Sequence, residues 1–194
     1  MEYKNILTGL ATVVGIIAYI PYFRDIVGGR TKPHVFSWFV WGLLTAIAFI
    51  AQVSDGAGPG ALVTGFTALA SFVFVAMALK WGEKHITRTD WASLVGALVS
   101  LGLWLVTKTP LLSVILITII DALAFYPTFR KSYFKPYQET MVTYTLSGLK
   151  FALAVAALDR WTVITALYPL SLVVMNWVFV GVLVVRRRQP GIVN

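Results

Sequence analysis

The stretch from Asp121 to Lys150 reads DALAFYPTFRKSYFKPYQETMVTYTLSGLK. This pattern is typical of an apolar helix that ends, a short cationic turn, and a second apolar helix that begins. Outside the turn, the only charged residues are Asp121 and Lys150, and each is set deep in apolar sequence. A similar stretch, from Ala18 to Leu44, reads AYIPYFRDIVGGRTKPHVFSWFVWGLL. These two stretches decide the predicted fold.

The two stretches align without a gap when Pro21 is placed on Pro127, a shift of 106 residues. Identical or similar residues then coincide over both helices and the turn. The pairs are Thr12 and Thr118, Ala18 and Ala124, Phe23 and Phe129, Arg24 and Arg130, Ser37 and Thr143, Trp38 and Tyr144, and Gly42 and Gly148. Chance produces one or two such matches but not the whole set. We therefore infer an internal duplication.

The composition indicates a membrane protein. The 194 residues are 58% hydrophobic and 12% charged, whereas soluble domains carry about 25% charged residues. The net charge of +8 does not indicate nucleic-acid binding, because the basic residues lie between apolar runs rather than along one face. The chain has no cysteine, which excludes disulfides and thiolate metal sites.

Seven apolar runs, of which the fourth is short, are candidates for membrane-spanning helices, which need about 20 mainly apolar residues. Charged residues, glycines and prolines separate them. The first run has no basic region before it and no small-residue cleavage site after it, so we expect a retained helix rather than a signal peptide. The predicted spans are 5–23, 35–54, 61–79, 91–106, 111–129, 140–158 and 161–185.

The duplication divides the seven spans into three, one and three. Residues 5–80 form the first three-helix repeat, 87–107 the linker helix and 111–188 the second repeat. A linker is required because three helices leave the ends of a repeat on opposite sides of the membrane. Parallel repeats of this kind occur in transporters. The predicted fold is therefore an all-α integral membrane protein with two parallel repeats.

The distribution of lysine and arginine predicts the orientation in the membrane. Twelve of these residues fall in turns on one side and three on the other. Because cytoplasmic loops carry the excess of positive charge, we expect the N-terminus outside and the C-terminus in the cytoplasm. The expected location is the cell membrane.

This arrangement resembles the SWEET and PQ-loop superfamily of seven-helix membrane transporters, in a prokaryotic branch. The motifs that carry the resemblance are YIPYFR at 19–24 and FYPTFRKS at 125–132, where the Pro-Gln dipeptide of the family is replaced by Pro-Tyr and Pro-Thr. SWEET proteins move sugars, and their relatives include amino-acid exporters and a peptide-signal receptor. The resemblance implies that Pro21 and Pro127 are hinges of alternating access, and the alternative is that each merely ends a helix.

Asp121 and Lys150 are the leading candidates for a binding site. Asp121 precedes Arg130 by nine residues, which places it roughly 13 Å into the membrane. Lys150 follows Glu139 by eleven residues, hence roughly 16 Å from the same side. A charge at that depth must face protein or a water-filled cavity. The matched depths predict an ion pair that a solute opens by competing for one partner, and a purely structural pair is the alternative.

Asn176 and the adjacent Trp177 are further candidates for the binding site, because Asn176 lies ten residues before Arg186 and hence roughly 15 Å deep. The resemblance implies an asparagine that faces the solute from the third helix of each repeat. A hydrogen bond between helices is the alternative. The counterparts of Asp121, Lys150 and Asn176 in the first repeat are Gly15, Leu44 and Ala70, so the deep polar residues belong to the second repeat.

Aromatic residues of the first repeat complete the predicted site. We expect Tyr19, Trp38 and Trp41 to stack on a solute from that side, with packing and anchoring at the membrane interface as the alternative. No zinc spacing, nucleophile–base arrangement, Walker loop or dinucleotide fingerprint occurs in the sequence. The sequence therefore predicts no enzyme activity, no metal and no cofactor.

The predicted function is a multi-pass membrane carrier that moves a small polar solute, which is sugar-like or amino-acid- or vitamin-like, by alternating access at a midplane site. The alternative is a non-transporting membrane receptor or assembly protein on the same fold. The expected partners are the solute and membrane lipid, with homo-oligomerisation left open and no nucleic acid.

Overall fold

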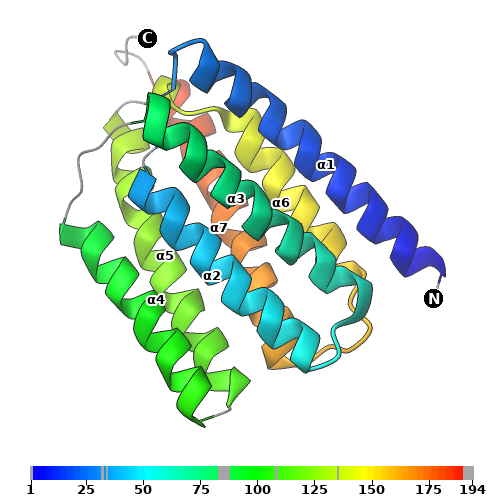
Figure 1. Ribbon diagram of the computed structural model, residues 1–194. Coiled ribbons are helices and arrows are strands. Elements are labelled where there is room, and N and C mark those ends of the chain that lie inside the picture. The colour runs from blue at the N-terminus through cyan, green and yellow to red at the C-terminus, as the bar shows by residue number, and fades with distance from the viewer. Residues whose placement is uncertain are drawn as a thin grey trace.

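The computed structural model describes residues 2–31, 33, 35–82, 88–107, 109–134 and 136–189, apart from a few side chains within helices. These residues form seven α-helices and two short 3₁₀ turns and contain no β-strand (Figure 1). The α-helices are α1 (Glu2–Val27), α2 (Val35–Ser54), α3 (Ala61–Trp81), α4 (Arg88–Thr107), α5 (Pro110–Phe134), α6 (Met141–Ala156) and α7 (Val163–Arg187), and the turns are η1 (Gly58–Gly60) and η2 (Pro136–Gln138). The predicted all-α class is confirmed.

Each apolar run of the sequence falls on one of these helices. The bounds of α2 are those predicted, whereas α1 continues past Phe23 to Val27 and passes through Pro21 without a break. It ends where two glycines follow, and Gly29 has a φ of 70°. This left-handed conformation carries no steric penalty for glycine, which is why glycine commonly follows a helix end.

In the part of the chain that the structure describes, four helices are long and apolar enough to cross a membrane, as judged by length and composition. These segments are Glu2–Val27, Ser37–Ser54, Gly60–Trp81 and Val163–Arg187. The outward faces are covered with exposed apolar side chains, and on α1 they include Ile6, Leu10, Val13 and Ile20. A continuous apolar surface of this kind is not a water-facing surface of a soluble monomer. The helices therefore indicate a membrane protein.

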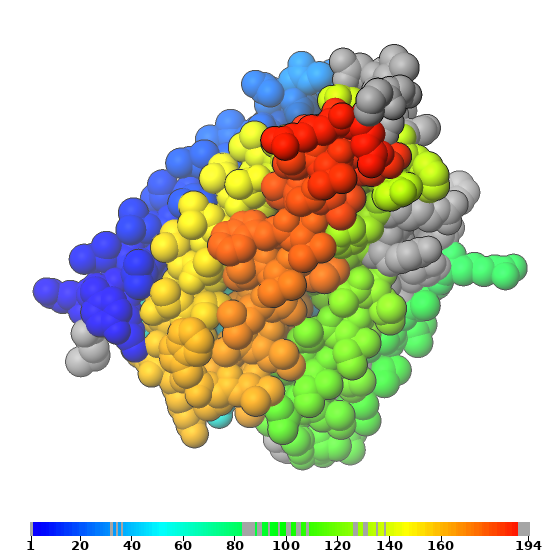
Figure 2. All heavy atoms as spheres, turned by 180° about the vertical axis from the view of Figure 1, so that it is seen from behind, coloured from blue at the N-terminus to red at the C-terminus, as the bar shows by residue number. Residues whose placement is uncertain are grey.

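The helices do not pack in the order of the sequence. α1 packs against α6, α6 against α7 and α7 against α5, and Figure 2 shows these four helices side by side on one face. α2 packs against α3 and α5, and α4 lies against α5 and α2. Although α5 and α6 are consecutive, α7 packs against both of them and lies between them.

The largest apolar cluster joins α2, α5, α6 and α7. Its members include Leu44, Ile117, Phe151, Tyr168 and Leu172. Small side chains allow close helix contacts around it. A Cβ atom on Gly42 of α2 would lie 3.2 Å from the Phe72 ring of α3, and one on Gly148 of α6 would overlap the Trp177 ring of α7.

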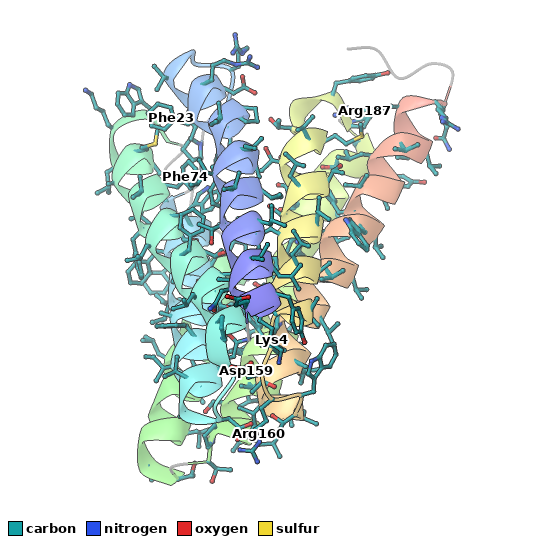
Figure 3. The ribbon with its side chains drawn as sticks, turned by 90° about the vertical axis from the view of Figure 1, so that its right-hand side faces the viewer. Lys4, Phe23, Phe74, Asp159, Arg160 and Arg187 are labelled. Atoms are coloured by element: carbon teal, nitrogen blue, oxygen red, sulfur yellow. The ribbon has the colours of Figure 1, made fainter. Side chains whose placement is uncertain are left out.

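The two ends of the bundle differ. Lys4, Asp159 and Arg160 lie at one end, where the helices are close together, and Arg187 lies at the other, where they spread apart (Figure 3). Among the described residues, Asp121 and Lys150 are the buried charged side chains. They lie in the middle of α5 and α6 and not near either end of these helices.

Candidate functional site

A cavity of about 1130 Å³ enters the bundle from the end at which Arg187 lies. Arg30, Glu139 and Arg187 line its entrance, and the buried side chains of Asp121 and Lys150 line its interior. We call the end with this entrance the open end. The lining comes from α1, α2, α3, α5, α6 and α7, so the cavity lies between helices from both halves of the chain.

The main lining side chains of each helix recur at a spacing of three or four residues, which puts them on one helix face. The sets are Tyr19 and Tyr22 on α1, Trp38, Trp41 and Thr45 on α2, Thr67 and Ser71 on α3, Asp121, Phe125 and Thr128 on α5, Tyr144, Ser147, Lys150 and Phe151 on α6, and Tyr168, Leu172 and Asn176 on α7. The cavity wall is thus a series of mixed polar and aromatic stripes on otherwise apolar helices.

Lys150 extends from α6 towards α1 and α3. Its Nζ atom donates hydrogen bonds of 3.0 Å to the hydroxyl of Tyr19 and of 3.0 Å to Oγ1 of Thr67. The ammonium group also lies 4.9 Å from the centre of the Tyr19 ring and 4.3 Å from that of Phe151. Aromatic faces and hydroxyl oxygens both stabilise a buried cation.

Gly15 provides the room for this lysine. A Cβ atom at Gly15 would lie 2.8 Å from Cδ of Lys150 and 3.0 Å from Cε1 of Phe66. Because Gly15 has no side chain, the aliphatic part of Lys150 can lie directly against α1. Gly15 is also the residue that the duplication aligns with Asp121.

Asp121 lies on α5, on the wall that faces α7. The hydroxyl of Tyr168 is adjacent to its carboxyl group. Even so, Oδ2 of Asp121 and the hydroxyl of Tyr168 are both buried and lack a hydrogen-bond partner among the described residues. A buried polar atom without a partner is costly and uncommon. This part of the wall can therefore accept further hydrogen bonds.

The expected ion pair between Asp121 and Lys150 is wrong for this structure. Among the described residues, neither side chain forms a salt bridge. The expectation assumed that consecutive helices are neighbours, whereas α7 lies between α5 and α6. Lys150 consequently meets Tyr19 of α1, and Asp121 meets Tyr168 of α7. Both charged groups line one cavity without pairing.

The predicted aromatic residues of the first half of the chain also line the cavity. The Nε1 atom of Trp38 donates a 3.0 Å hydrogen bond to the hydroxyl of Tyr22. The rings of Trp38 and Trp41 are perpendicular, with centroids 5.3 Å apart, and Trp41 lies 5.9 Å from the ring of Phe125. The buried Nε1 atom of Trp41 has no hydrogen-bond partner among the described residues. This wall can stack on a solute and can donate one hydrogen bond to it.

The structure separates Asn176 from Trp177. Asn176 is buried, lines the cavity, and donates from Nδ2 to the carbonyl of Leu172 at 2.7 Å. Trp177 is not among the lining residues; its side chain is 47% exposed, packs over Gly148 and donates to the carbonyl of Thr145 at 3.4 Å. Of the seven predicted binding residues, the structure brings six to the cavity and leaves Trp177 outside it.

The predicted hinge prolines are placed only in part. Pro21 lies inside the continuous helix α1. Pro127 falls within α5, but its side chain lies outside the described residues. No group of His, Cys, Asp or Glu that could hold a metal ion occurs in the described part of the chain. His34 and His85 fall outside it.

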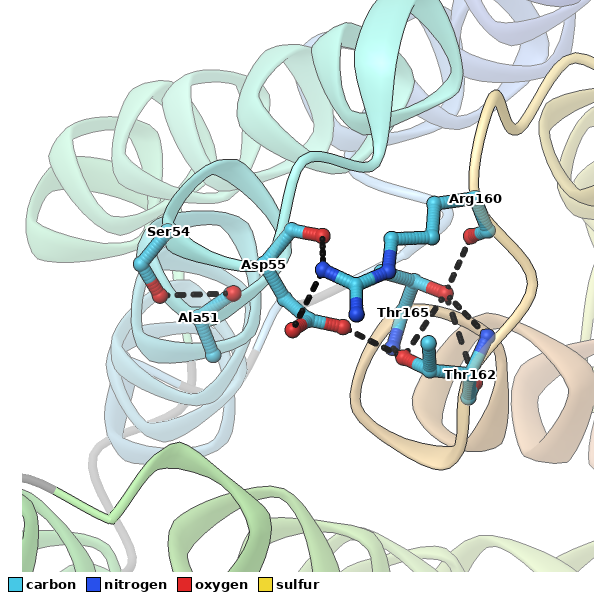
Figure 4. A network of polar contacts seen from close by, with 6 residues as sticks. All are labelled: Ala51, Ser54, Asp55, Arg160, Thr162 and Thr165. Carbon is cyan, nitrogen blue, oxygen red and sulfur yellow. Dashed lines mark hydrogen bonds and ion pairs between the residues drawn. The ribbon is translucent and has the colours of Figure 1, made fainter.

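The end opposite the entrance is held together by polar contacts between the two halves of the chain (Figure 4). Asp55, which follows α2, forms an ion pair with Arg160 at 3.5 Å and accepts a hydrogen bond from the hydroxyl of Thr162. Lys4 of α1 lies 2.9 Å from Asp159 and donates to the carbonyl of Leu158 at 2.8 Å. We call this end the closed end.

A second contact near the closed end involves Pro169, which lies inside α7. Because proline has no N–H group, the carbonyl of Thr165 loses its usual partner within the helix. The Nε2 atom of Gln52 on α2 donates to that carbonyl at 2.8 Å. An amide side chain from the first half of the chain thus replaces the hydrogen bond that the proline removes.

Several cavity residues were not predicted from the sequence, notably Thr67, Ser71 and Tyr168. For each of them, the spacing of polar residues in the sequence indicated a position facing the interior. Thr64, Thr67 and Ser71 recur at helical spacing within an apolar run, and all three are buried. Tyr168 precedes Asn176 by eight residues, which is close to two helical turns and hence the same face. Polar residues at this spacing in an apolar helix indicate a polar interior.

Comparisons of the chain with protein-family models, with curated proteins and with solved structures find no match.

Proposed function

We propose that this protein is a multi-pass membrane carrier that moves a small polar solute by alternating access. The observation that carries the proposal is the cavity of about 1130 Å³, which has an entrance at one end of the bundle and contacts across the other end. A cavity with one entrance and a polar interior between two halves of a chain is the geometry that an alternating-access carrier has in one of its two states.

We further propose that the seven helices form two parallel three-helix repeats with α4 as the linker. The helix contacts support this. α3 packs against α1 and α2, and α7 packs against α5 and α6, while α1 contacts α6 and α5 contacts α2. Each contact in one half therefore has an equivalent in the other under the shift of 106 residues. In this proposal the chain belongs with the SWEET-like carriers that its motifs resemble, and the two proline-containing helices bend between the states.

The proposed orientation has the closed end outside and the open end in the cytoplasm. The support is electrostatic. Helices α1 and α7 end at the open end, with Arg24 in the last turn of α1 and Arg186 and Arg187 in the last turn of α7. Arg30 lines the entrance, and Lys80 is in the last turn of α3. The closed end has Lys4 and Arg160 among the described residues. This uneven distribution of positive charge follows the rule for cytoplasmic loops. The arrangement described above would then be the inward-facing state of the carrier.

Transport is tested with purified protein in liposomes. The vesicles are loaded with a defined mixture of hexoses, amino acids and water-soluble vitamins, and the released compounds are measured by mass spectrometry against protein-free vesicles. We expect at least one compound to leave only the vesicles that contain protein. If none does, the carrier is refuted and a receptor on the same fold takes its place.

Alternating access is tested by locking the closed end. The chain has no cysteine, so Asp55→Cys and Arg160→Cys can be joined by a short bis-methanethiosulfonate, which forms a reducible disulfide with each introduced cysteine. Flux should stop on joining and return on reduction, while each single-cysteine variant treated with the same reagent keeps its flux. Flux that continues through the joined protein would show that the closed end does not open during transport.

A further inference from the structure

We propose that the cavity binds a zwitterion with an α-amino-acid head group, whose carboxylate meets Lys150 and whose ammonium group meets Asp121. The inference rests on the proposed function in one respect, that the cavity is the solute site. It names the chemistry of the solute, which the carrier proposal leaves open between sugar-like and amino-acid-like compounds.

The first observation is that the cavity holds one buried group of each charge and that the two do not neutralise each other. Asp121 and Lys150 are 2% and 1% exposed. Both line the cavity, and neither forms a salt bridge within the described part of the chain. Two opposite buried charges held apart by the fold are costly unless each finds a counter-charge. A zwitterion supplies both counter-charges in one molecule.

On the α1 side, Lys150 is arranged for an anion. An ammonium group has three donors, and the two hydrogen bonds to Tyr19 and Thr67 use two of them. The third is available for a ligand. The hydroxyls of Tyr19 and Thr67 both accept from Lys150. The O–H of Thr67 donates to the carbonyl of Val63 at 2.8 Å, so the O–H of Tyr19 is the one that can donate towards a carboxylate.

On the α7 side, Asp121 is arranged for a cation. Its buried Oδ2 atom has no hydrogen-bond partner among the described residues, and neither has the adjacent hydroxyl of Tyr168. A ligand ammonium group carries several N–H donors, which these oxygen atoms can accept. Of these two groups, the carboxylate oxygen can only accept and the tyrosine hydroxyl has a single O–H to donate, so an anion is not favoured here.

The two charged positions belong to one continuous wall. Tyr19, which accepts from Lys150, and Tyr168, which adjoins Asp121, both line the cavity. Each charged position thus has a tyrosine hydroxyl beside it on the wall of the same cavity. Trp38 and Trp41 form the adjoining wall, where the side chain of an amino acid can pack.

This arrangement favours a zwitterion over the other small polar solutes. A neutral sugar leaves both buried charges without a counter-charge, and a simple anion or cation balances only one of them. The energetic difference is large, because a hydrogen bond between charged groups contributes more than one between neutral groups. Selectivity should therefore follow the two charged ends of the solute more than its side chain.

The test is a binding assay that does not depend on transport. The intrinsic tryptophan fluorescence, to which Trp38 and Trp41 contribute, is followed in detergent-solubilised protein while each of the twenty common amino acids, and D-glucose as the neutral control, is added separately. Thermal unfolding provides an independent measurement. For the tightest amino acid, the amide and the deaminated acid are then compared. We expect each analogue, which lacks one charge, to bind about tenfold or more weakly, and glucose to bind more weakly still.

Substitutions of Lys150 and Asp121 test which charged end of the ligand each residue binds. In Lys150→Met the amino acid and its amide should bind equally, because the residue that distinguishes them is gone. In Asp121→Asn the amino acid and its deaminated acid should bind equally. Lys80→Met and Glu2→Gln, at exposed positions outside the cavity, should retain the discrimination of the unmodified protein.

Three outcomes overturn the inference: no binding by any amino acid, glucose binding as tightly as the best amino acid, or unchanged discrimination in Lys150→Met and Asp121→Asn. If either variant fails to fold, Tyr19→Phe and Tyr168→Phe are used instead: each removes one hydroxyl beside one charge and should reduce the discrimination at that end, and unchanged discrimination in both would overturn the inference. Binding without flux in liposomes would refute the carrier and leave the zwitterion site in place. Flux of a sugar, with no flux of an amino acid, would refute the zwitterion site and leave the carrier in place.

Discussion

The ammonium group of Lys150 donates a hydrogen bond to the hydroxyl of Tyr19 at 3.0 Å, although the two residues are 131 positions apart in the chain. The bond joins α6 to α1, two helices that are far apart in the sequence but pack extensively against each other. The bond depends on Gly15, because a side chain at this position of α1 would overlap the aliphatic part of Lys150. The predictions below follow from this contact and from the two ends of the bundle.

Gly15→Ala should destabilise the protein. The added Cβ atom would lie 2.8 Å from Cδ of Lys150 and 3.0 Å from a ring carbon of Phe66, and such overpacking costs about 1–3 kcal/mol. Gly9→Ala on the same helix is the matched control, because no atom lies within 4 Å of its added Cβ; there alanine should stabilise the helix by about 0.5–1 kcal/mol. Thermal unfolding in detergent measures both, and equal effects of the two substitutions would contradict the packing of Lys150 against α1.

Lys150 should be energetically coupled to Tyr19 and not to Asp121. A double-mutant cycle of Lys150→Met with Tyr19→Phe should show an interaction energy of about 0.5–3 kcal/mol, because the two groups share a hydrogen bond. The cycle with Asp121→Asn should be additive within about 0.5 kcal/mol. Unfolding by denaturant in detergent gives the free energies. A large coupling between Asp121 and Lys150 would show that the ion pair expected from the sequence forms after all.

Gln52→Leu should destabilise the contact between α2 and α7. The variant leaves the carbonyl of Thr165 buried without its donor, which costs about 1–3 kcal/mol. In a Pro169→Ala background the same substitution should cost less, because the alanine N–H can bond the Thr165 carbonyl within the helix. Unfolding free energies of the four variants test this, and an identical cost of Gln52→Leu in both backgrounds would mean that the proline does not create the need for Gln52.

Asp55→Asn should loosen the closed end. The substitution removes the negative charge that pairs with Arg160 and weakens the hydrogen bond from Thr162. A cysteine introduced at Ala57, which is fully buried beside this network, should then react several times faster with a maleimide than the same cysteine in the unmodified background. Glu2→Gln, an exposed acid outside the network, is the control and should leave the rate unchanged. Equal rates in all three proteins would show that the network does not hold the end shut.

The proposed orientation predicts which surface positions face the outside of the cell. Ser54 lies at the closed end and Gln189 at the open end, and both are exposed. In whole cells a membrane-impermeant thiol reagent should label Ser54→Cys and not Gln189→Cys, with both labelled after the membrane is made permeable. Labelling of the two positions from the same side would contradict the arrangement of seven crossings.

Much of the helical architecture can be predicted from the sequence because helix positions depend on local properties. Apolar runs, and the glycines and prolines between them, place α2 at its observed bounds. Four helices long and apolar enough to cross a membrane fall where the hydropathy predicts them. The positions of Asp121 and Lys150 deep in apolar sequence likewise mark both residues as site candidates, since a buried charge is costly wherever it lies.

Which side chains meet was decided by the tertiary structure alone. Asp121 and Lys150 are at similar depths on consecutive helices, yet α7 lies between those helices and directs each charge to a different partner. Asn176 and Trp177 are neighbours in sequence, but successive residues of a helix point roughly 100° apart, so the packing of α7 puts one in the cavity and the other on the outer surface. Depth along a helix is a local quantity that the residue count determines, whereas the direction of a side chain depends on how every other helix packs around it.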